Sequence, residues 1–505
     1  MTRIRSDRTP QQLRSDALAI WSAGVRAVQG FRLVTEQLVI DDHWLGLPEQ
    51  DLWIDLRTTR KIFVAGAGKA TASMARGVAQ VLTPQPVERL NGHVQIPEEA
   101  EFALDATSVF GAIDLRSIME NGEPSEPIPD WLKLYHVRPA GSNLVTDAAV
   151  AKTQELCQKL QGLGPNDVCL FLLSGGASAL LSAPVAGLSF AEKNHVTRFL
   201  SSVGAPIEEL NIVRSALSVI KAGGLARHCR AGLLVTLILS DVLGDPLPYI
   251  GSGPTFTDGR SAAERASRAM DVLRAYDPQR KNLPLAVYGA LDRQMQPSQA
   301  TNKAPTGHAN CEFVVLGNTA TAVDAAGIEA ERRGYSHAMH VQPPQMPERG
   351  STAPSAESNG LQWADWLSDM NQQAGPDCLI VGGESVVDLS GAIPESRGGR
   401  NQHLGLAALE HWERTQNRNW QRGEICFVSG GTDGEDGNTT VAGVCLSPEL
   451  RERCSHEELD IRAYLDTKNS YNYFRQTGGL LITGNTQTNV CDLQVGVVRQ
   501  RLASS

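Results

Sequence analysis

Short apolar runs and amphipathic stretches alternate along this chain. Continuous apolar runs at 61–66 (KIFVAG), 167–173 (DVCLFLL) and 232–240 (GLLVTLILS) are typical of strands that are buried on both faces. Stretches with helical spacing accompany them at 69–82 (KATASMARGVAQVL) and 147–163 (DAAVAKTQELCQKLQGL). Strands that alternate with helices predict a mostly parallel α/β sheet covered by helices on both faces.

Two polar segments, 296–310 and 342–360, interrupt this pattern. They are rich in Pro, Ser, Gln and Asn, as linkers are. A chain of 505 residues also exceeds the roughly 250–300 at which a single core stops growing. We therefore predict two domains, at 10–300 and 301–505. The short strands and many glycines of the second half indicate a smaller, mixed sheet there.

Composition and charge narrow the function classes. Apolar residues make up 41% of the chain, charged residues 20%, and the formal net charge is -10. Because there is no basic surplus, we expect neither nucleic acid nor an acidic membrane as a partner. The nine cysteines are scattered without a C-x-x-C pair, and the N-terminal residues lack the apolar core of a signal peptide. We therefore expect reduced thiols and a cytoplasmic location.

The first turn with candidate chemistry follows the first apolar run. Gly66 and Gly68 fit the start of a dinucleotide fingerprint, but Thr71 stands at its third glycine, and the acidic residue expected about 20 positions further on is missing. Lys69 follows Gly68 as in a Walker loop, yet Ala70 replaces the required Ser or Thr. What remains is a lysine at a helix N-terminus, a position suited to an anion.

Two further turns follow predicted strands. Ser174, Gly175 and Gly176 can direct backbone N–H groups at a phosphate. Ser178 matches the nucleophile elbow of a serine hydrolase only in part, because Leu180 replaces the last glycine of that motif.

Asp241 and Asp245 follow the run at 232–240. Carboxylates in this position can hold Mg²⁺ or accept the proton of an attacking hydroxyl.

The second half contributes charged, glycine-rich loops. Glu384 ends a predicted strand, and Arg400 lies in a loop that opens a helix, where its planar guanidinium suits a carboxylate or a phosphoryl group. Asp433, Glu435 and Asp436 share a loop whose spacing does not match an EF-hand. Cations, carboxylates and glycine turns together suit phosphoryl transfer, which depends on positioning and charge neutralisation.

These segments resemble, in order, those of the class II glycerate kinases, the family whose C-terminal portion is called the MOFRL domain. The matching stretches are 66–70 (GAGKA), 173–184 (LSGGASALLSAP), 210–226 (LNIVRSALSVIKAGGLA), 240–255 (SDVLGDPLPYIGSGPT), 382–384 (GGE), 398–402 (GGRNQ), 429–437 (SGGTDGEDG) and 469–493 (NSYNYFRQTGGLLITGNTQTNVCDL). They span nearly the whole chain.

The resemblance implies a Rossmann-like α/β/α sandwich and a smaller mixed α/β domain of the MOFRL type, with the active site in the cleft between them. It implies ATP- and Mg²⁺-dependent phosphorylation of D-glycerate, typically at the 2-hydroxyl, to give 2-phospho-D-glycerate. The expected partners are these small molecules, and a homodimer is a candidate assembly.

Three positions match catalytic residues of the family: Lys69 and Arg400 its invariant cationic pair, and Asp241 its conserved acid. We expect Asp241 to accept or orient the proton of the attacking hydroxyl, Lys69 to neutralise the phosphoryl group, and Arg400 to bind the glycerate carboxylate. The other expected site residues are Arg214, Ser174 and Lys221 for the substrate, Gly66, Gly68, Gly175, Gly176, Gly431, Thr432 and Asp433 for the nucleotide, and Asp245 and Glu384 for the metal.

Two alternative functions remain open. An NAD(P)H-dependent hydroxypyruvate reductase would need the dinucleotide site whose third glycine and acidic residue are missing. A non-catalytic protein that binds a sugar acid or a nucleotide would share the site without turnover. The chain also departs from the family pattern at Ser215, Asn485 and Gln487 and in the segment from His136, positions that concern substrate specificity more than the reaction class.

Overall fold

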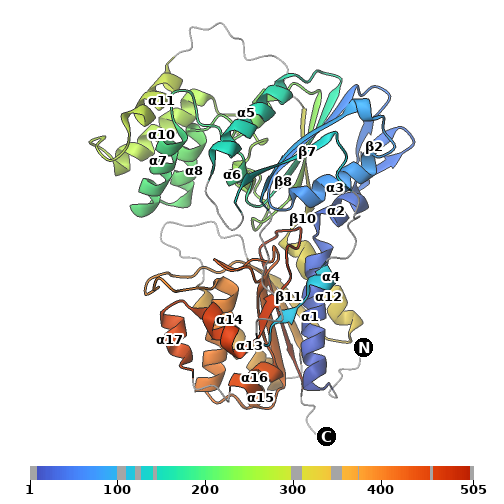
Figure 1. Ribbon diagram of the computed structural model, residues 1–505, viewed down its shortest axis with the longest axis vertical. Helices are drawn as coiled ribbons and strands as arrows, with labels where there is room; N and C mark the ends of the chain where they lie inside the picture. The colour runs from blue at the N-terminus through green and yellow to red at the C-terminus, as the bar shows by residue number, and fades with distance from the viewer. Residues whose placement is uncertain are drawn as a thin grey trace.

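The computed structural model describes residues 8–98, 110–119, 127–139, 145–296, 310–342, 355–372, 375–454 and 459–500. The chain forms two α/β units, one above the other in Figure 1. Most of the two polar segments predicted as linkers, and part of the segment that begins at His136, lie outside the described residues.

The upper unit is built on a six-stranded sheet in which every neighbouring pair is parallel. In spatial order its strands are β10 (Asn310–Gly317), β9 (Leu233–Leu239), β8 (Asp167–Ser174), β4 (Lys61–Ala67), β5 (Leu90–Pro97) and β7 (Leu132–Arg138). From β4 the chain first adds strands on one side, then returns to add β8, β9 and β10 on the other. The order therefore reverses between β4 and β8, and ligands of open α/β sheets bind at such a switch point, beyond the carboxyl ends of the strands.

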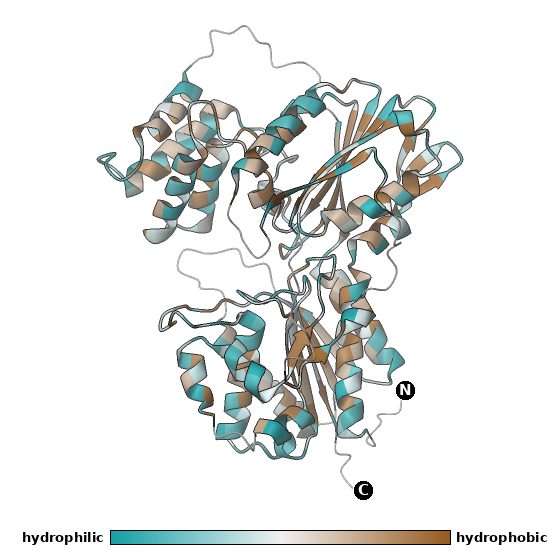
Figure 2. Cartoon of the chain, in the orientation of Figure 1, coloured by the Kyte–Doolittle hydropathy of each residue, from teal (hydrophilic) through white to brown (hydrophobic). Residues whose placement is uncertain are grey.

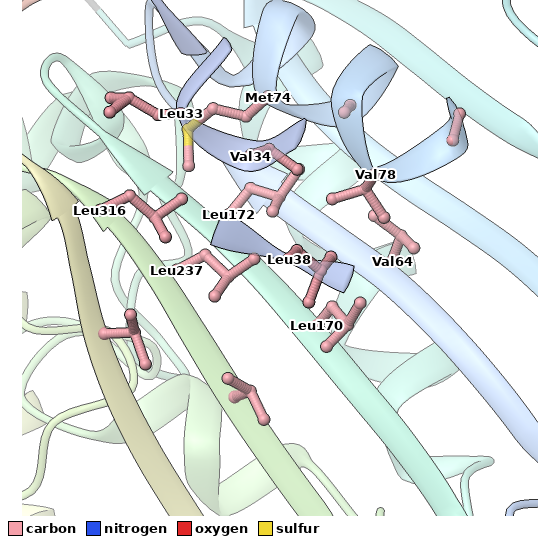
Figure 3. Packing of buried hydrophobic residues seen from close by; sticks show 14 of the residues in the cluster. Leu33, Val34, Leu38, Val64, Met74, Val78, Leu170, Leu172, Leu237 and Leu316 are labelled. Carbon is pink, nitrogen blue, oxygen red and sulfur yellow. The ribbon is translucent and has the colours of Figure 1, made fainter. Parts of the chain in front are cut away.

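Helices cover both faces of this sheet. On one face, α2 (Gly30–Gln37) and α3 (Thr71–Leu82) bury Val34 and Met74 against Leu172 and Leu237 of the strands (Figure 3). On the other face lie α5 (Asp147–Gln161), α6 (Ala177–Leu180) and α9 (Gly224–His228). The predicted α/β/α sandwich is confirmed. A small antiparallel sheet, formed by β1 (Val39–Asp41), β2 (Trp44–Leu47) and β3 (Leu52–Asp55), lies beside it.

Four helices form a separate layer at the upper left of Figure 1, with a core of their own. They are α7 (Phe190–Ser202), α8 (Ile207–Ala216), α10 (Ala262–Tyr276) and α11 (Leu285–Met295). Their buried core includes Val196, Leu200, Val213 and Leu273. Helix α8 of this group carries Arg214, one of the cationic residues predicted from the sequence.

The lower unit is built on a seven-stranded mixed sheet. In spatial order its strands are β11 (His337–Val341), β12 (Cys378–Gly383), β16 (Asp492–Val498), β13 (Ile425–Gly431), β14 (Gly443–Leu446), β15 (Leu480–Ile482) and β6 (Ile113–Asp114). Four of its neighbouring pairs are antiparallel, and the pairs at the two edges are parallel. The predicted mixed sheet is confirmed, although with seven strands it is not smaller than the first sheet.

Helices also cover both faces of the mixed sheet. One face carries α1 (Pro10–Ala27) and α12 (Thr319–Arg332), and the other carries α13 (Ala356–Gln372) and α14 (Arg400–Arg414). The remaining short helices are α4 (Arg116–Met119), α15 (Arg418–Gln421), α16 (Pro448–Cys454), α17 (Ile461–Asp466) and α18 (Ser470–Thr477). Figure 2 shows the resulting contrast between apolar strands inside and polar helix surfaces outside.

The two sheets do not divide the chain at the predicted boundary near residue 300. Strand β10 was assigned to the second domain, yet it pairs with β9 and completes the first sheet. Helix α1 lies at the start of the chain, yet it packs on the second sheet, where the indole of Trp21 donates to the carbonyl of Leu493. The physical reason is that a polar segment marks a loop, whereas sheet membership depends on pairing with distant strands, which local composition does not encode.

Seven of the nine cysteines are buried, which agrees with the predicted role as small apolar side chains. Within the described segments, no helix combines the length and the apolar character that crossing a membrane requires.

The packing of α1 predicts that the start of the chain is needed for the stability of the second unit. Leu13 is fully buried in the cluster between α1 and the mixed sheet, so Leu13→Ala should lower the free energy of unfolding by about 2–5 kcal/mol. Urea unfolding measures this change. Leu285→Ala is the matched control, because this side chain is 73% exposed and its loss should change stability by less than about 0.5 kcal/mol. Equal effects of the two substitutions would contradict the packing described.

Candidate functional site

The turns after β4 and β8 are locked together at the switch point of the first sheet. The backbone N–H of Lys69 donates to the carbonyl of Gly175 at 2.8 Å, and the N–H of Ala70 donates to Oγ of Ser174 at 3.0 Å. Gly68 has a φ of +150°, and a Cβ there would lie 2.0 Å from Ser174 Oγ. Ser174 is fully buried, so its hydroxyl holds the lysine turn in place rather than facing a ligand.

Lys69 connects the two units through ion pairs. Its Nζ donates to Asp433 at 2.7 Å and to Glu435 at 2.8 Å, both in the turn after β13 of the second sheet. Burial works to lower the pKa of Lys69, but these two carboxylates outweigh it and raise that pKa above its ordinary value. Lys69 is therefore a permanent cation at the junction of the two sheets.

Asp241 follows β9 and faces the same junction. Its carboxylate lies 3.5 Å from the side-chain amide of Asn489, and its backbone carbonyl accepts from the thiol of Cys491 at 3.0 Å. Burial raises the pKa of Asp241 to about 6, and the charge of Asp433 adds to this rise, whereas Lys69 and Arg400 oppose it. A carboxylate with this pKa can exchange a proton near neutral pH.

Two of the predicted glycines are required by close packing. A Cβ on Gly175 would lie 2.3 Å from both the Asp241 carboxylate and the Asn489 amide, so only glycine leaves room for them. A Cβ on Gly66 would lie 2.6 Å from the carbonyl of Leu172 in β8, so this glycine serves the approach of β4 to β8. Gly175 therefore lies beside the carboxylate of the candidate site, whereas Gly66 is needed for the pairing of the two strands.

Arg400 is the first residue of α14 and is held by two carboxylates. It donates to Asp492 at 2.5 Å and 3.0 Å and to Glu384 at 2.6 Å. Burial works to lower the pKa of Arg400, but these carboxylates raise it. Burial raises the pKa of Glu384 to about 7, and Asp492, Asp241 and Asp433 add to this rise against the opposing charge of Arg400. The side chain of Asp492 is 2% exposed and that of Glu384 is 43% exposed, so Glu384 is the accessible partner.

The three acids of the turn after β13 have different environments. Asp436 is buried and accepts from the backbone N–H groups of Asn401 and Gln402 at 3.1 Å and 2.8 Å, which satisfies donors at the start of α14. Burial raises the pKa of Asp436 to about 6. Asp433 and Glu435 instead contact Lys69. Asp436 therefore orients the helix that carries Arg400, while the other two acids belong to the charged centre.

Thr432 and Gly431, predicted to bind the nucleotide, lie at the end of β13. The Thr432 hydroxyl donates to the carbonyl of Cys491 at 2.7 Å and accepts from the N–H of Val490 at 2.9 Å. Because Thr432 is 1% exposed, its hydroxyl stabilises the strand ends. A Cβ on Gly431 would lie 2.6 Å from the carbonyl of Glu435, so this glycine allows the acidic turn to fold back on the strand.

Asp245, predicted as a metal ligand, has one carboxylate oxygen in use and one available. Oδ2 accepts from the Asn318 side chain at 2.6 Å, whereas Oδ1 is buried and has no hydrogen-bond partner in the part of the chain that the structure describes. An orphaned anionic oxygen fits a cation. In the described part of the chain, no three or more His, Cys, Asp or Glu side chains are grouped to hold a metal. The arrangement fits Mg²⁺, which commonly takes one or two carboxylates and completes its shell with phosphate oxygens and water.

The predicted substrate-binding cations are distributed between two pockets. Arg214 and Lys221 line a cavity of about 270 Å³ together with Gly176, in the first unit. Arg400 lines a different cavity of about 360 Å³, in the second unit. Arg400 and Arg214, both expected to bind the substrate, therefore line different cavities.

Several residues at the junction escaped the sequence predictions. Asp492 and Asn489 lie in the C-terminal matching stretch, but their contacts with Arg400 and Asp241 cross 92 and 248 positions of sequence. Lys193 lines the same cavity as Arg214, on α7. In the sequence, Lys193 falls at helical spacing from Val196 and Leu200, on the apolar face of α7. A lysine in an amphipathic helix is usually exposed, so this position alone does not predict a buried cation.

Two family models match the chain. The one described as "Domain of unknown function (DUF4147)" matches residues 16–292, and the one described as "MOFRL family" matches residues 377–492. The first covers more than half of the chain and the upper unit up to α11, and the second covers most of the mixed sheet.

Relatives and a solved structure match over most of their length. The chain is 31% identical to a glycerate kinase from Homo sapiens over 97% of this chain and 94% of the relative. It is 31% identical to a D-glycerate 2-kinase from Thermotoga maritima over 75% and 83%. The crystal structure of a glycerate kinase from Thermotoga maritima matches with a TM-score of 0.71 and 29% identity, over 97% of this chain and all of that one.

The close approach at Gly175 makes a direct prediction. Gly175→Ala should displace the Asp241 carboxylate from the lysine turn while the fold is kept, because the atoms that would clash are side-chain ends rather than backbone. A crystal structure of the variant measures this displacement. Gly375→Ala is the control, since no atom of the described residues that it could clash with lies within 4 Å of its added Cβ. An unmoved Asp241 in Gly175→Ala would contradict the packing at the junction.

Proposed function

The chain belongs to the family of glycerate kinases whose C-terminal portion is the MOFRL domain, and on that premise we propose that it transfers a phosphoryl group from ATP to the 2-hydroxyl of D-glycerate with Mg²⁺. The observation that carries the proposal is the meeting of Lys69, Asp241 and Arg400 at the junction of the two sheets, where their charges influence one another. The Thermotoga maritima relative is a D-glycerate 2-kinase, which supports the 2-position.

Asp241 is the group that takes the hydroxyl proton. Its raised pKa of about 6 means that the carboxylate is ionised at neutral pH and is still basic enough to accept a proton in the transition state. Gly175 leaves the space that this carboxylate needs, and Asn489 fixes one of its oxygens. The proton of the 2-hydroxyl passes to Asp241 as the oxygen attacks phosphorus.

Lys69 neutralises charge on the transferring phosphoryl group. Its backbone is held by Gly175 and its ammonium by Asp433 and Glu435, so the cation is positioned before a ligand arrives. Phosphoryl transfer gains most from such prepositioned charge, because the protein has little covalent chemistry to perform.

Arg400 is the proposed partner of the glycerate carboxylate. Asp492 fixes the plane of its guanidinium through two hydrogen bonds, and the half-exposed Glu384 is the partner that an incoming carboxylate replaces. Burial and three neighbouring carboxylates raise the pKa of Glu384. The ionised form of Glu384 is therefore less favourable here than in water, which makes this partner of Arg400 easier to replace.

Asp245 and Glu384 are the proposed ligands of Mg²⁺. The unpartnered Oδ1 of Asp245 and the crowding of Glu384 by other carboxylates both favour a bound cation. When bound, Mg²⁺ supplies neutralisation of phosphate charge. The turn at Gly175 and Gly176 is the proposed phosphate-binding turn for the nucleotide, and Ser174 supports it through the hydrogen bond from Ala70. The homodimer and the cytoplasmic location remain predictions.

The reaction product tests the proposal directly. Purified protein with D-glycerate, ATP and Mg²⁺ should give a 2-phosphoglycerate resonance in ³¹P NMR, because the attacking group is the 2-hydroxyl. A parallel assay with hydroxypyruvate and NADH should show no loss of NADH. A 3-phosphoglycerate resonance would overturn the regiochemistry. NADH oxidation without any phosphoglycerate would establish the reductase alternative, and ligand binding with neither product would indicate a non-catalytic protein.

The raised pKa of Asp241 makes a pH prediction. A base must be deprotonated, so kcat/KM for D-glycerate should fall about tenfold for each pH unit below pH 6 and level off above it. Asp241→Asn should lose most activity at every pH, and its residual rate should lack this step. Asp271→Asn is the control, since this carboxylate is 66% exposed on α10. A wild-type profile that stays flat down to pH 5 would contradict the role of Asp241.

A further inference from the structure

A cationic cavity lies next to the phosphate-binding turn of the first unit. It measures about 270 Å³ and lies among α6, α7 and α8, and it includes Gly176. Its cations are Lys193, Arg214 and Lys221, with Arg198 also on its wall, and none of its described lining residues is acidic. In a chain with a net charge of -10, this local excess of positive charge requires an explanation.

Lys193 is a buried cation without a partner. The residue is 6% exposed, and its Nζ has no hydrogen-bond partner among the described residues. Burial lowers the pKa of Lys193 to about 8, and the charge of Arg214 adds to this effect. A buried, unpaired ammonium is strongly unfavourable for folding, so its presence at a cavity wall points to an anionic ligand that completes it.

Lys221 is buried on the same wall, and the hydrogen-bond partners of its ammonium are two neutral hydroxyl groups. Its Nζ donates to the hydroxyls of Ser252 at 2.8 Å and Ser178 at 3.1 Å. Burial lowers the pKa of Lys221, and the charges of Arg214 and Lys193 add to this effect. The two hydroxyls, which lie 2.7 Å from each other, hold the ammonium in one direction, and that of Ser178 also lines the cavity as a further polar contact for a ligand.

The charge of the cavity discriminates between candidate ligands. Glycerate has a single carboxylate, which would leave most of the positive charge uncompensated. The phosphate chain of a nucleotide carries several negative charges, and its oxygens accept hydrogen bonds from ammonium, guanidinium and hydroxyl donors. The cavity also adjoins Gly176, and a Cβ on Gly176 would lie 3.4 Å from Cγ of Lys69, so it opens beside the proposed phosphoryl-transfer centre.

We propose that this cavity binds the phosphate chain of the nucleotide and that Lys193 contacts a phosphate oxygen directly. The assignment rests on the proposed kinase function, and it moves Arg214 and Lys221 from the glycerate site to the nucleotide site. Lys193 becomes a nucleotide-binding residue, and the carboxylate of glycerate is left to Arg400.

Binding of inorganic tripolyphosphate tests the site without requiring turnover. Wild-type protein should bind tripolyphosphate in isothermal titration calorimetry, and Lys193→Met should weaken that binding roughly 10- to 100-fold, because a charge-assisted contact is lost. Thermal unfolding without ligand should be unchanged or shifted upward in Lys193→Met, since an unpaired buried cation is replaced by an apolar side chain. Lys281→Met, at an exposed position of the same helical layer, should bind as the wild type does.

Steady-state kinetics distinguish the two anions. Lys193→Met and Arg214→Met should raise KM for MgATP by a similar factor and leave KM for D-glycerate nearly unchanged. A rise in KM for D-glycerate alone would assign the cavity to the substrate carboxylate and overturn the proposal. Unweakened tripolyphosphate binding in Lys193→Met, or no binding by the wild type, would overturn it as well. If tripolyphosphate binds as expected and no phosphoglycerate forms, the kinase function fails while the phosphate site stands.

Discussion

The ion pairs of Lys69 with Asp433 and Glu435 are the interaction on which the site depends. They join the carboxyl ends of strands in two separate sheets, and further contacts hold the turn on each side in place. The backbone of Lys69 is tied to the turn after β8, while the acidic turn is folded back on β13 and packed against the start of α14 through Asp436. Displacing any of these turns would move the cation relative to Asp241 and Arg400.

Charge is distributed unevenly around this junction. Asp241, Glu384, Asp433 and Asp492 crowd one side, and burial together with mutual repulsion raises the pKa of the first two. The cavity beyond Gly176 gathers cations instead, and the same two causes lower the pKa of Lys193. A magnesium nucleotide carries both signs of charge, a cation for the carboxylates and phosphates for the lysines. The uneven distribution therefore complements this ligand better than it complements a singly charged acid.

Local sequence patterns predicted the elements that pack locally. Buried strands such as β4, β8 and β9 are recognisable in the sequence as apolar runs, and turns of glycine and polar residues mark where they end. The division of the chain was harder to predict. β10 joins the first sheet and α1 the second, because their partners lie far away in sequence. Ser174 and Thr432 resemble ligand-binding residues in their motifs, but their hydroxyls are used inside the protein.

The sequence by itself determined the residue types at the strand ends: a lysine after β4, paired glycines after β8, an aspartate after β9 and an arginine at the start of α14. Only the tertiary structure decided which of them meet. Lys69 and Asp433 are 364 residues apart, and Arg400 and Asp492 are 92 apart. The structure also decided that Lys193 is buried without a hydrogen-bond partner among the described residues, while Lys281 is exposed. The physical reason is that a side chain's charge state and contacts depend on its neighbours in space, whereas local sequence specifies only its neighbours along the chain.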